Sequence, residues 1–263
     1  MTRRVKSPSD ANPGARGALE RRRLDVLLLE RGLAETRAKA QALLLAGRVY
    51  SGEQRLEKAG QLVSIDIELC VREGPRYVSR GGTKLEGALR ALRVEVHDRV
   101  CADIGASTGG FTDCLLQHGA RRVYAVDVGE RLLAQKLLAD SRVVVMDKTN
   151  ARFLDATSFP EPIELAVVDA SFIGVEKLLS ALAAILPPDA ALLALIKPQF
   201  QAGRAEAARH RGVIRDPALR ARLIEEARNE FEAHGFSVIA GVDSELEGPK
   251  GNLEHFLFAT RRS

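Results

Sequence analysis

The chain has 263 residues, of which 46% are hydrophobic and 28% are charged, and its net charge at pH 7 is +4. These values are typical of a globular protein and exclude a disordered or fibrous chain. No apolar run approaches the ~18 residues of a membrane span, and the start lacks the apolar stretch of a secretory signal, so we expect a cytoplasmic protein. Three cysteines without a CxxC pair and five scattered histidines predict no disulfide framework and no metal site.

The positive charge is concentrated at the front of the chain. Residues 1–80 contain 16 Lys and Arg against 10 Asp and Glu, whereas residues 81–263 contain 23 against 25. A cationic segment attached to a nearly neutral one suggests that the front binds an anion such as nucleic acid. Charge alone favours the simpler interpretation of a solvated basic face.

The first 75 residues predict a tail followed by a small domain. Residues 1–18 contain Pro, Gly and Arg but almost no large apolar side chains, which predicts a disordered tail. Two helices, ending at Gly32 and Gly47, are predicted within residues 21–33 and 35–47, and short strands at 48–50, 61–63 and 65–71. Residues 19–75 thus predict an α+β domain of marginal size. A Gly-Pro break precedes the linker expected at residues 76–79.

From Arg80 onward, apolar runs alternate with amphipathic helical patterns. Strands are predicted at residues 100–105, 122–128, 142–147, 164–170, 191–197, 236–243 and 254–262, and helices at 83–92, 110–119, 130–139, 174–186 and 216–235. This alternation indicates an α/β fold with a mostly parallel sheet and helices on both faces. No helix separates the last two strands, so the last strand is expected to run antiparallel.

A glycine-rich loop, DIGASTGGFTD at residues 103–113, follows the first strand of this sheet. Glycines at such a turn let the backbone approach a ligand at the carboxyl edge of the sheet. The loop is not a GxGxxG dinucleotide motif, because Ser107 and Thr108 replace the second glycine region, and alone it also fits a tight turn. Asp127 ends the next strand, where an acid can accept hydrogen bonds from ribose hydroxyls, and Asp147 ends the third. Together these features favour a nucleoside-type ligand.

Four charged residues are expected at the same edge. Asp169 and Lys197 end two buried strands, and Glu254 begins the inverted last strand. Lys84, near the start of the helix that precedes the first strand, can approach this edge. Two cations and two carboxylates would then surround one point beside the ligand. Taken singly, Lys84 and Glu254 fit equally well as ordinary charged residues on a helix surface and at a strand end.

The motifs resemble those of a known family. The glycine loop, Asp127 and the four charged residues are similar to those of S-adenosylmethionine-dependent ribose methyltransferases of the FtsJ type. From about Arg21, the whole chain resembles the TlyA (haemolysin A) family, in which an RNA-binding domain of the ribosomal protein S-four kind precedes the methyltransferase domain. The stretches that carry this resemblance are RRRLDVLLLERGLAETRAKAQALLLAGRVY, YVSRGGTKLEGAL, DIGASTGGFTD, VVDASF, IKPQF, GVIRD and GNLEHF. The chain departs from the pattern at Ser51, where Asn is common; both residues suit a turn.

The resemblance implies a 2′-O-methyltransferase acting on ribosomal RNA, with cytidine as the usual target nucleoside and a Rossmann-like sheet over residues 80–263. From the chemistry of methyl transfer, our hypothesis is that Lys197 touches the attacking hydroxyl as base or orienter, that Asp169 holds Lys197 and lies near the methyl donor, and that Lys84 with Glu254 fixes and tunes this pair. The implied S-adenosylmethionine-binding residues are Asp103, Gly105, Ala106, Ser107, Thr108, Gly109, Gly110, Phe111, Asp127, Val128, Asp147, Lys148 and Asp169.

RNA is expected to contact basic residues of both domains. Two of them begin the second predicted helix and a third follows it, which indicates a basic face. About twenty residues after Lys197 are rich in Arg and Gly, and we expect them to form a loop that closes on RNA. The expected RNA-binding residues are Arg23, Arg37, Lys39, Arg48, Arg80, Arg211 and Arg215.

Three other functions stay open. A non-catalytic RNA-binding or ribosome assembly factor would have lost its glycine loop or tetrad, and this chain shows neither loss. A haemolytic, membrane-acting protein would need an apolar length or an amphipathic surplus that the sequence does not offer. A small-molecule methyltransferase would have no use for the basic front domain.

Overall fold

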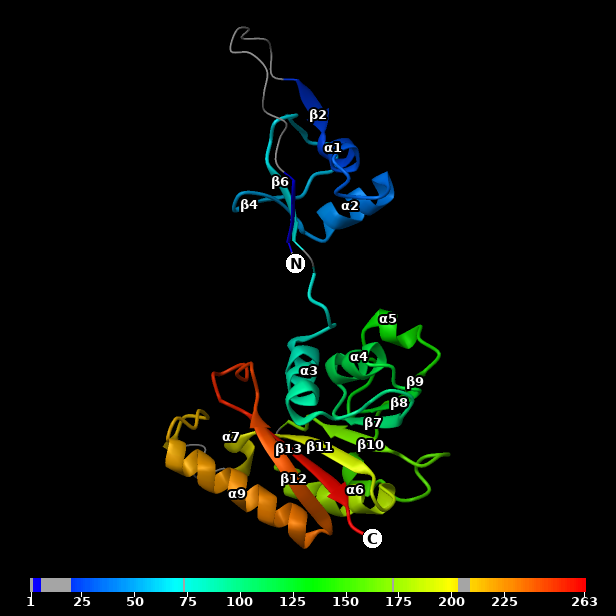
Figure 1. The fold of residues 1–263 in the computed structure, drawn as a ribbon, viewed down its shortest axis with the longest axis vertical. Coiled ribbons are helices and arrows are strands. Elements are labelled where there is room, and N and C mark those ends of the chain that lie inside the picture. The colour runs from blue at the N-terminus through cyan, green and yellow to red at the C-terminus, as the bar shows by residue number, and fades with distance from the viewer. Residues whose placement is uncertain (1, 6–19, 73, 172, 203–208) are drawn as a thin grey trace. The chain divides into compact units, whose positions relative to one another are not determined.

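The computed structural model describes residues 2–5, 20–72, 74–171, 173–202 and 209–263 (Figure 1). Contacts within the chain divide it into two compact units, Met1–Arg76 and Tyr77–Ser263. Each unit has a hydrophobic core of its own, and each is described separately below.

The smaller unit packs two short helices against short strands. A four-stranded sheet has the order β1-β6-β3-β4, and β2 pairs with β5. Leucines on one side of each helix fill the core, among them Leu24, Leu28 and Leu44, which are at most 1% exposed. Thr36 caps α2 by accepting a hydrogen bond from the Lys39 amide, as expected for an N-cap threonine. The elements are β1 (Thr2–Val5), β2 (Arg21–Arg23), α1 (Leu24–Glu30), α2 (Arg37–Leu45), β3 (Val49–Ser51), β4 (Gln54–Leu56), β5 (Leu62–Ser64) and β6 (Leu69–Arg72).

The smaller unit differs from the sequence expectation in four places, the first of which is β4, a strand that the sequence did not predict and that pairs with β3. Thr2–Val5, expected in a disordered tail over residues 1–18, form β1 and pair antiparallel with β6; the rest of that expected tail lies outside the described residues. The first helix begins at Leu24 rather than at Arg21, because Arg21–Arg23 pair with β5. The strand expected at residues 65–71 begins only at Leu69. In the other three places, pairing between distant segments decided the local structure.

The larger unit contains the predicted sheet. Its seven strands have the order β12-β13-β11-β10-β7-β8-β9, in which β13 runs antiparallel to both of its neighbours. This confirms the expected α/β fold with a mostly parallel sheet and an inverted last strand. The strands are β7 (Val100–Ile104), β8 (Arg122–Val126), β9 (Val143–Met146), β10 (Leu165–Val168), β11 (Ala191–Ile196), β12 (Phe236–Asp243) and β13 (His255–Arg261).

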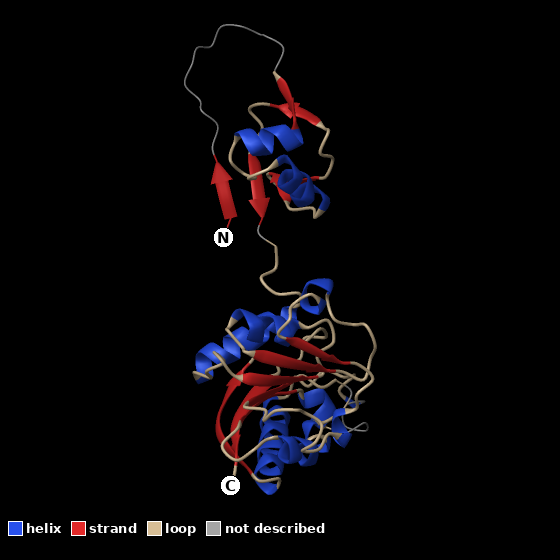
Figure 2. Cartoon of the chain, turned by 90° about the vertical axis from the view of Figure 1, so that its right-hand side faces the viewer, coloured by secondary structure: helices blue, strands red, loops and turns tan. Residues whose placement is uncertain are grey.

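Helices cover both faces of this sheet, which Figure 2 shows between them. On one face, α3 (Arg80–Leu92) and α4 (Gly110–Gln117) contribute Leu85, Leu115 and neighbouring side chains to one core. On the other face, α6 (Leu179–Ile185) and α9 (Pro217–Ala233) contribute Leu182 and Phe231 to a second core. The strands alternate their side chains between these two layers and are therefore apolar on both faces.

Three predicted segments of the larger unit fold differently. Only α5 (Gln135–Leu138) is helical within residues 130–139, because the turn before it places Arg131 at a φ of 55°, outside the helical region. Residues 174–186 divide into a 3-10 turn, Val175–Lys177, and α6. Directly after Lys197, α7 (Pro198–Gln201) forms where a loop was expected. Elsewhere in this unit, a further 3-10 turn spans Ala151–Phe153.

The expected linker at residues 76–79 belongs mostly to the larger unit. Tyr77 is 2% exposed and lies in the core beneath α3 and α4. The Val78 amide donates to Asp113 Oδ2 at 2.8 Å, and Ser79 caps α3 by accepting from the Gly81 amide. Gly82 is needed here, because a Cβ atom on it would come within 2.4 Å of the Tyr77 side chain. The segment is therefore anchored to the helix that follows the glycine loop.

Candidate active site

The carboxyl ends of adjacent strands bring the glycine loop and the charged residues onto one edge. Ile104 pairs with Val168, so the next residues along the two strands, Gly105 and Asp169, are neighbours. At the end of β11, Ile196 pairs with His255 of the antiparallel β13. Continuing this register places Lys197 opposite Glu254, as the sequence had predicted. Helix α3 adds Lys84 from the face of the sheet.

Lys84 and Glu254 form a buried ion pair between α3 and the start of β13. Their side chains are only 7% and 1% exposed. The chain before Glu254 folds over its carboxylate, and a Cβ atom on Gly248 would lie 2.6 Å from Glu254 Oε1. The Glu254 carbonyl also accepts a hydrogen bond from the Ser244 amide at 2.9 Å. Gly248 is therefore a functional-site residue that sequence reasoning missed, and its small size lets the loop seal this pair.

Lys197 forms a second pair with Asp169, at 2.5 Å between Nζ and Oδ1, and its side chain is 10% exposed. The same Nζ donates to Ser171 Oγ at 2.8 Å. The ring of Phe200 on α7 lies 5.9 Å from Nζ, within the range of a cation–π contact. The four charged residues thus form two ion pairs on one edge. Ser171, which sequence reasoning did not identify, is a further partner of Lys197.

The glycine loop has the backbone that its glycines predict. Gly105 and Gly109 adopt φ angles of 87° and 90°, and a Cβ atom on Gly105 would lie 2.7 Å from the Asp169 carbonyl oxygen. These two positions therefore require glycine. Between them, Ser107 and Thr108 are exposed, so the tip of the loop is open to a ligand.

Two of the expected cofactor-binding residues have buried side chains. Phe111 is 3% exposed and stacks on Phe256 with 6.1 Å between the ring centroids, and Ala106 is 6% exposed in the same core. These side chains support the glycine loop, so contacts of the two residues with a ligand would come from their backbone atoms.

The acids after β8 and β9 shape the loops around them. Asp127 accepts the amides of Ser107 and Gly129, each at 2.8 Å, through different carboxylate oxygens. Asp147 Oδ2 accepts the Arg131 amide at 2.9 Å. A carboxylate has about four acceptor positions, so both acids keep acceptors for ligand hydroxyl or amino groups. Beside them, Val128 is 69% exposed and offers apolar surface. Lys148 is exposed, and its Nζ lies 2.9 Å from Glu130.

Asp103 is a fully buried carboxyl beneath the glycine loop. Its Oδ2 accepts the amide and the hydroxyl of Thr112, at 2.8 and 2.6 Å, and its Oδ1 has no hydrogen-bond partner. Burial raises the pKa of Asp103 to about 7, against the two Thr112 hydrogen bonds, and the nearby Asp169 and Asp127 raise it further. Near neutral pH this carboxyl therefore gains or loses its proton easily.

We expect the pKa of Asp103 to make stability fall as pH rises. The unfolded chain ionises Asp103 near pH 4, whereas the fold keeps the proton up to about pH 7, so the stability from the neutral carboxyl is lost between these values. Relative to Asp103→Asn, the wild type should lose about 4 kcal/mol of unfolding free energy across this range.

Chemical denaturation at several pH values measures this difference. Asp155→Asn is the matched control: it keeps Asp103, so its unfolding free energy should follow the pH curve of the wild type, because hydrogen bonds from Thr157 hold the pKa of the exposed Asp155 below its ordinary value. Parallel pH curves for the wild type and Asp103→Asn would contradict the assignment.

The basic residues expected to bind RNA in the smaller unit fall into two groups. Asp25 is fully buried and accepts hydrogen bonds from Arg23 and Arg37 at 2.9 to 3.1 Å, and from Gln41 at 3.0 Å. The Arg23 hydrogen bonds in particular keep the pKa of Asp25 well below its usual range. Arg23 and Arg37 therefore hold the fold together, although both remain about half exposed. Lys39 and Arg48 form no ion pair within the described part of the chain.

In the larger unit, Arg80, Arg211 and Arg215 are exposed. The segment that carries Arg211 and Arg215 is tied to the loop before Glu254 through the buried Asn252. Asn252 Oδ1 accepts the Ile214 amide and its Nδ2 donates to the Gly212 carbonyl, both at 2.9 Å. The basic segment is thus fixed beside the strand end that carries Glu254. Residues 203–208 of the expected RNA-closing loop lie outside the described residues.

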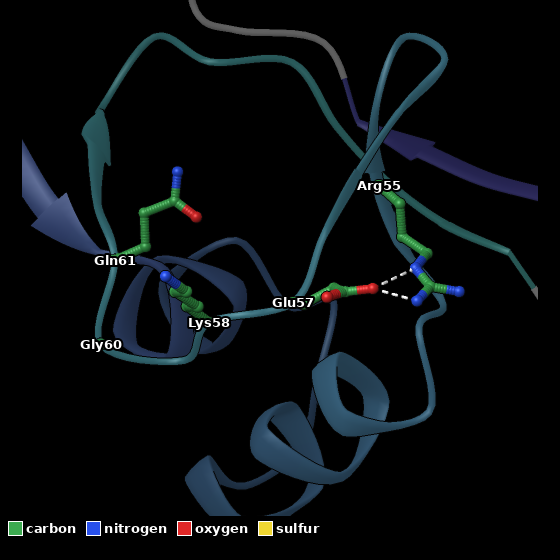
Figure 3. Close-up of a pocket in the computed structure, with 5 residues that line it drawn as sticks. All are labelled: Arg55, Glu57, Lys58, Gly60 and Gln61. Carbon is green, nitrogen blue, oxygen red and sulfur yellow. Dashed lines mark hydrogen bonds and ion pairs between the residues drawn. The ribbon is translucent and has the colours of Figure 1, made fainter.

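An open pocket lies in the smaller unit (Figure 3). The side chains of Lys58 and Gln61 stand on one side of it, and on the other Arg55 Nε donates to Glu57 Oε1 at 2.6 Å. Gly60 completes the lining. Within the described ranges, no group of three His, Cys, Asp or Glu residues could hold a metal ion. None of the helices described combines the length and apolar character needed to cross a membrane.

Comparison with known proteins identifies the family of both units. The model of the FtsJ-like methyltransferase family matches residues 77–262, and that of the S4 domain matches residues 22–66. The 16S/23S rRNA (cytidine-2′-O)-methyltransferase TlyA of Mycobacterium tuberculosis is 41% identical over 240 residues, which cover 90% of this chain and 89% of that protein. This chain belongs to the TlyA family of FtsJ-like methyltransferases. The family assignment confirms the resemblance seen in the sequence.

Other known proteins match this chain over similar lengths. YqxC of Bacillus subtilis is 47% identical over 240 residues, covering 90% of this chain and 85% of that protein. A solved structure from Streptococcus thermophilus superposes with a TM-score of 0.70 at 40% identity, covering 94% of this chain and 90% of that one. The similarity therefore includes both units and is not confined to the methyltransferase sheet.

Proposed function

We propose that the protein transfers a methyl group from S-adenosylmethionine to the 2′-hydroxyl of a cytidine in ribosomal RNA. The observation that carries this proposal is the pair of ion pairs, Lys84–Glu254 and Lys197–Asp169, on the sheet edge beside the glycine loop. The relative from M. tuberculosis, whose name states this reaction, supports the choice of substrate and nucleoside.

The residues at the edge of the sheet fit S-adenosylmethionine, which would supply an activated methyl group. The exposed tip of the glycine loop and the tight Gly105 turn would admit the methionine part, and Asp127 would accept ribose hydroxyls. Asp147 and the exposed Val128 would hold the adenine. The unpartnered, buried Oδ1 of Asp103 is an acceptor close to these groups, and Lys148 lines the outer side.

In this proposal, Lys197 acts on the ribose hydroxyl. Its stem is buried by β11, its Nζ is held by Asp169, and the strand end directs the amine to the edge where the loop lies. In this position the amine accepts the hydroxyl proton or orients the oxygen toward the methyl group. Lys84 and Glu254 keep the end of β13 in place against Lys197. Aligning the reacting atoms in this way can supply roughly 7 to 11 kcal/mol of the barrier reduction.

The smaller unit would bind RNA through basic residues that form no ion pair within the described part of the chain. Lys39 and Arg48 belong to this group, and Arg211 and Arg215 would approach RNA beside Glu254. Arg23 and Arg37 would contribute less than the sequence suggests, because Asp25 holds their guanidinium groups. Because the proposed substrate is ribosomal RNA, we expect the reaction to take place in the cytoplasm.

Removing Lys39 should weaken RNA binding without unfolding the protein. Lys39→Ala keeps a good helix former on the exposed side of α2, so we expect lower affinity for all RNA sequences and a salt slope reduced by about 0.7 to 0.9. Filter binding or fluorescence anisotropy across a salt series measures both quantities. The control is Arg121→Ala, which should leave the salt slope unchanged. Arg121 pairs with Glu164 and lies at the amino ends of the parallel strands, away from the edge that carries Lys197. An unaltered slope in Lys39→Ala would refute the assignment.

Mapping ribose methylation tests the proposed function directly. Ribosomal RNA from cells with and without the protein should differ at one or more cytidine 2′-O-methyl sites, and purified protein should restore the methyl group in vitro. A non-catalytic assembly factor would bind RNA and leave methylation unchanged. A haemolytic protein would lyse cells without S-adenosylmethionine, and a small-molecule methyltransferase would not need the smaller unit.

A further inference from the structure

Ser171 is the one hydroxyl seen bonded to the Lys197 amine among the described residues. It lies two residues after Asp169, just beyond the end of β10, so one short extended segment supplies both partners of Nζ. Unlike Lys197, Ser171 is exposed. Sequence reasoning passed over it, because an exposed serine after a strand is ordinary loop composition.

We propose that Ser171 is a positioning residue for methyl transfer, which fixes the direction of the Lys197 amine and allows it to change protonation state. This inference rests on the proposed function. It assigns to Ser171 no contact with RNA or with the methyl donor.

The first argument is geometric. A lysine amine has three N–H donors on a rotating group. Ser171 Oγ accepts the one hydrogen bond given for this amine, at 2.8 Å, whereas Asp169 Oδ1 lies 2.5 Å from Nζ as an ion-pair partner outside hydrogen-bond geometry, and the ring of Phe200 lies 5.9 Å away. Ser171 therefore fixes one N–H direction, which orients the remaining two relative to the ribose hydroxyl. Without Ser171, the amine can turn about its single ion pair.

The second argument concerns the proton. The carboxylate of Asp169 accepts but does not donate, and its charge stabilises the ammonium form of Lys197 much more than the neutral amine. A serine hydroxyl accepts a hydrogen bond from an ammonium and donates one to a neutral amine. Ser171 therefore has a favourable hydrogen bond in both states, before and after the 2′-hydroxyl proton moves to Nζ. Exposure of Ser171 also gives the hydroxyl contact with solvent water.

Ser171→Ala and Ser171→Thr separate this role from a structural one. We expect Ser171→Ala to lower kcat about 10- to 100-fold, the size of effect that misplacement of a reacting group produces. The KM for RNA and the Kd for S-adenosylhomocysteine should stay within about twofold of wild type, because Ser171 touches neither ligand. Ser171→Thr keeps the hydroxyl and should recover most of the rate. Ser180→Ala, an exposed serine on α6, is the matched control.

A spectroscopic measurement reports on the amine itself. In the intact protein, a Lys197 amine hydrogen-bonded to Ser171 and paired with the Asp169 carboxylate should exchange its protons slowly and give a resolved ¹⁵N-edited signal. That signal should weaken or shift in Ser171→Ala and persist in Ser171→Thr and Ser180→Ala.

The outcomes distinguish this inference from the proposed function. If Ser171→Ala methylates RNA at the wild-type rate while Lys197→Ala is inactive, the proposed function stands and the role of Ser171 is wrong. Equal losses in Ser171→Ala and Ser171→Thr would also overturn it, because the hydroxyl would then not be the feature that matters. If wild-type protein methylates no RNA, the proposed function itself fails.

Discussion

Lys197→Arg and Lys197→Ala should both abolish methyl transfer and leave the protein folded. Arginine keeps the positive charge, but its planar guanidinium is larger and does not lose its proton, so it cannot replace the amine between Asp169 and Ser171. The loss expected for a group that handles the transferred proton is on the order of 10²- to 10⁴-fold in kcat. Transfer of labelled methyl groups from S-adenosylmethionine to RNA measures the rate.

The control for this substitution is Lys177→Arg, a lysine with 63% side-chain exposure in the 3-10 turn before α6. It should have the wild-type rate. Circular dichroism and thermal denaturation show whether the Lys197 variants keep the fold. A folded Lys197→Arg protein with a near-normal rate would remove Lys197 from the chemistry.

Glu254→Ala should cost both activity and stability. It leaves the Lys84 ammonium buried without its partner, and breaking a buried ion pair in this way typically costs about 3 to 5 kcal/mol of unfolding free energy. The end of β13 next to Lys197 would lose its anchor on α3, so methyl transfer should fall with it. Urea denaturation measures the first effect and the methyl-transfer assay the second.

The double variant Lys84→Met, Glu254→Leu separates these two effects. Replacing both charges by apolar groups of similar size often restores stability, so we expect unfolding free energy close to that of the wild type. Activity should remain lost, since the charges that hold the edge are gone. If the double variant recovered methyl transfer, the buried pair would matter only for packing. If Glu254→Ala unfolded as the wild type does, the pair would not be buried in solution.

Much of this site was predictable, because it depends on strand direction. The apolar runs predict parallel strands, and the carboxyl ends of parallel strands lie at one edge of the sheet. Because Asp169, Lys197 and the glycine loop each follow such a strand, they lie at the same edge. Glu254 joined them because two strands with no helix between them must run antiparallel. The family motifs then supplied the chemistry that the pattern could not name.

The parts that escaped prediction depend on side-chain contacts between distant segments. The hydrogen bonds of Asp25 with Arg23 and Arg37 form only when α1 and α2 pack together. The basic face inferred from the sequence therefore contained more unpaired positive charge than the folded unit has. Gly248 lies against the Glu254 carboxylate in a turn. The spacing of apolar residues predicts helices and strands but not the shape of such a turn. Thr2–Val5 form a strand only because β6 provides a partner, which local composition cannot reveal.

The charge balance at the edge of the sheet bears on the order in which the two substrates arrive. The charges of two lysines and two carboxylates cancel there, and the carboxyl groups of Asp127 and Asp147 add negative charge beside the loop. A phosphate backbone that reached this edge of the sheet would meet that negative charge, and the positive charge of a bound sulfonium would offset the repulsion. If the smaller unit binds RNA as proposed, it can do so with or without the methyl donor, but the target ribose should settle over Lys197 only once the methyl donor is in place.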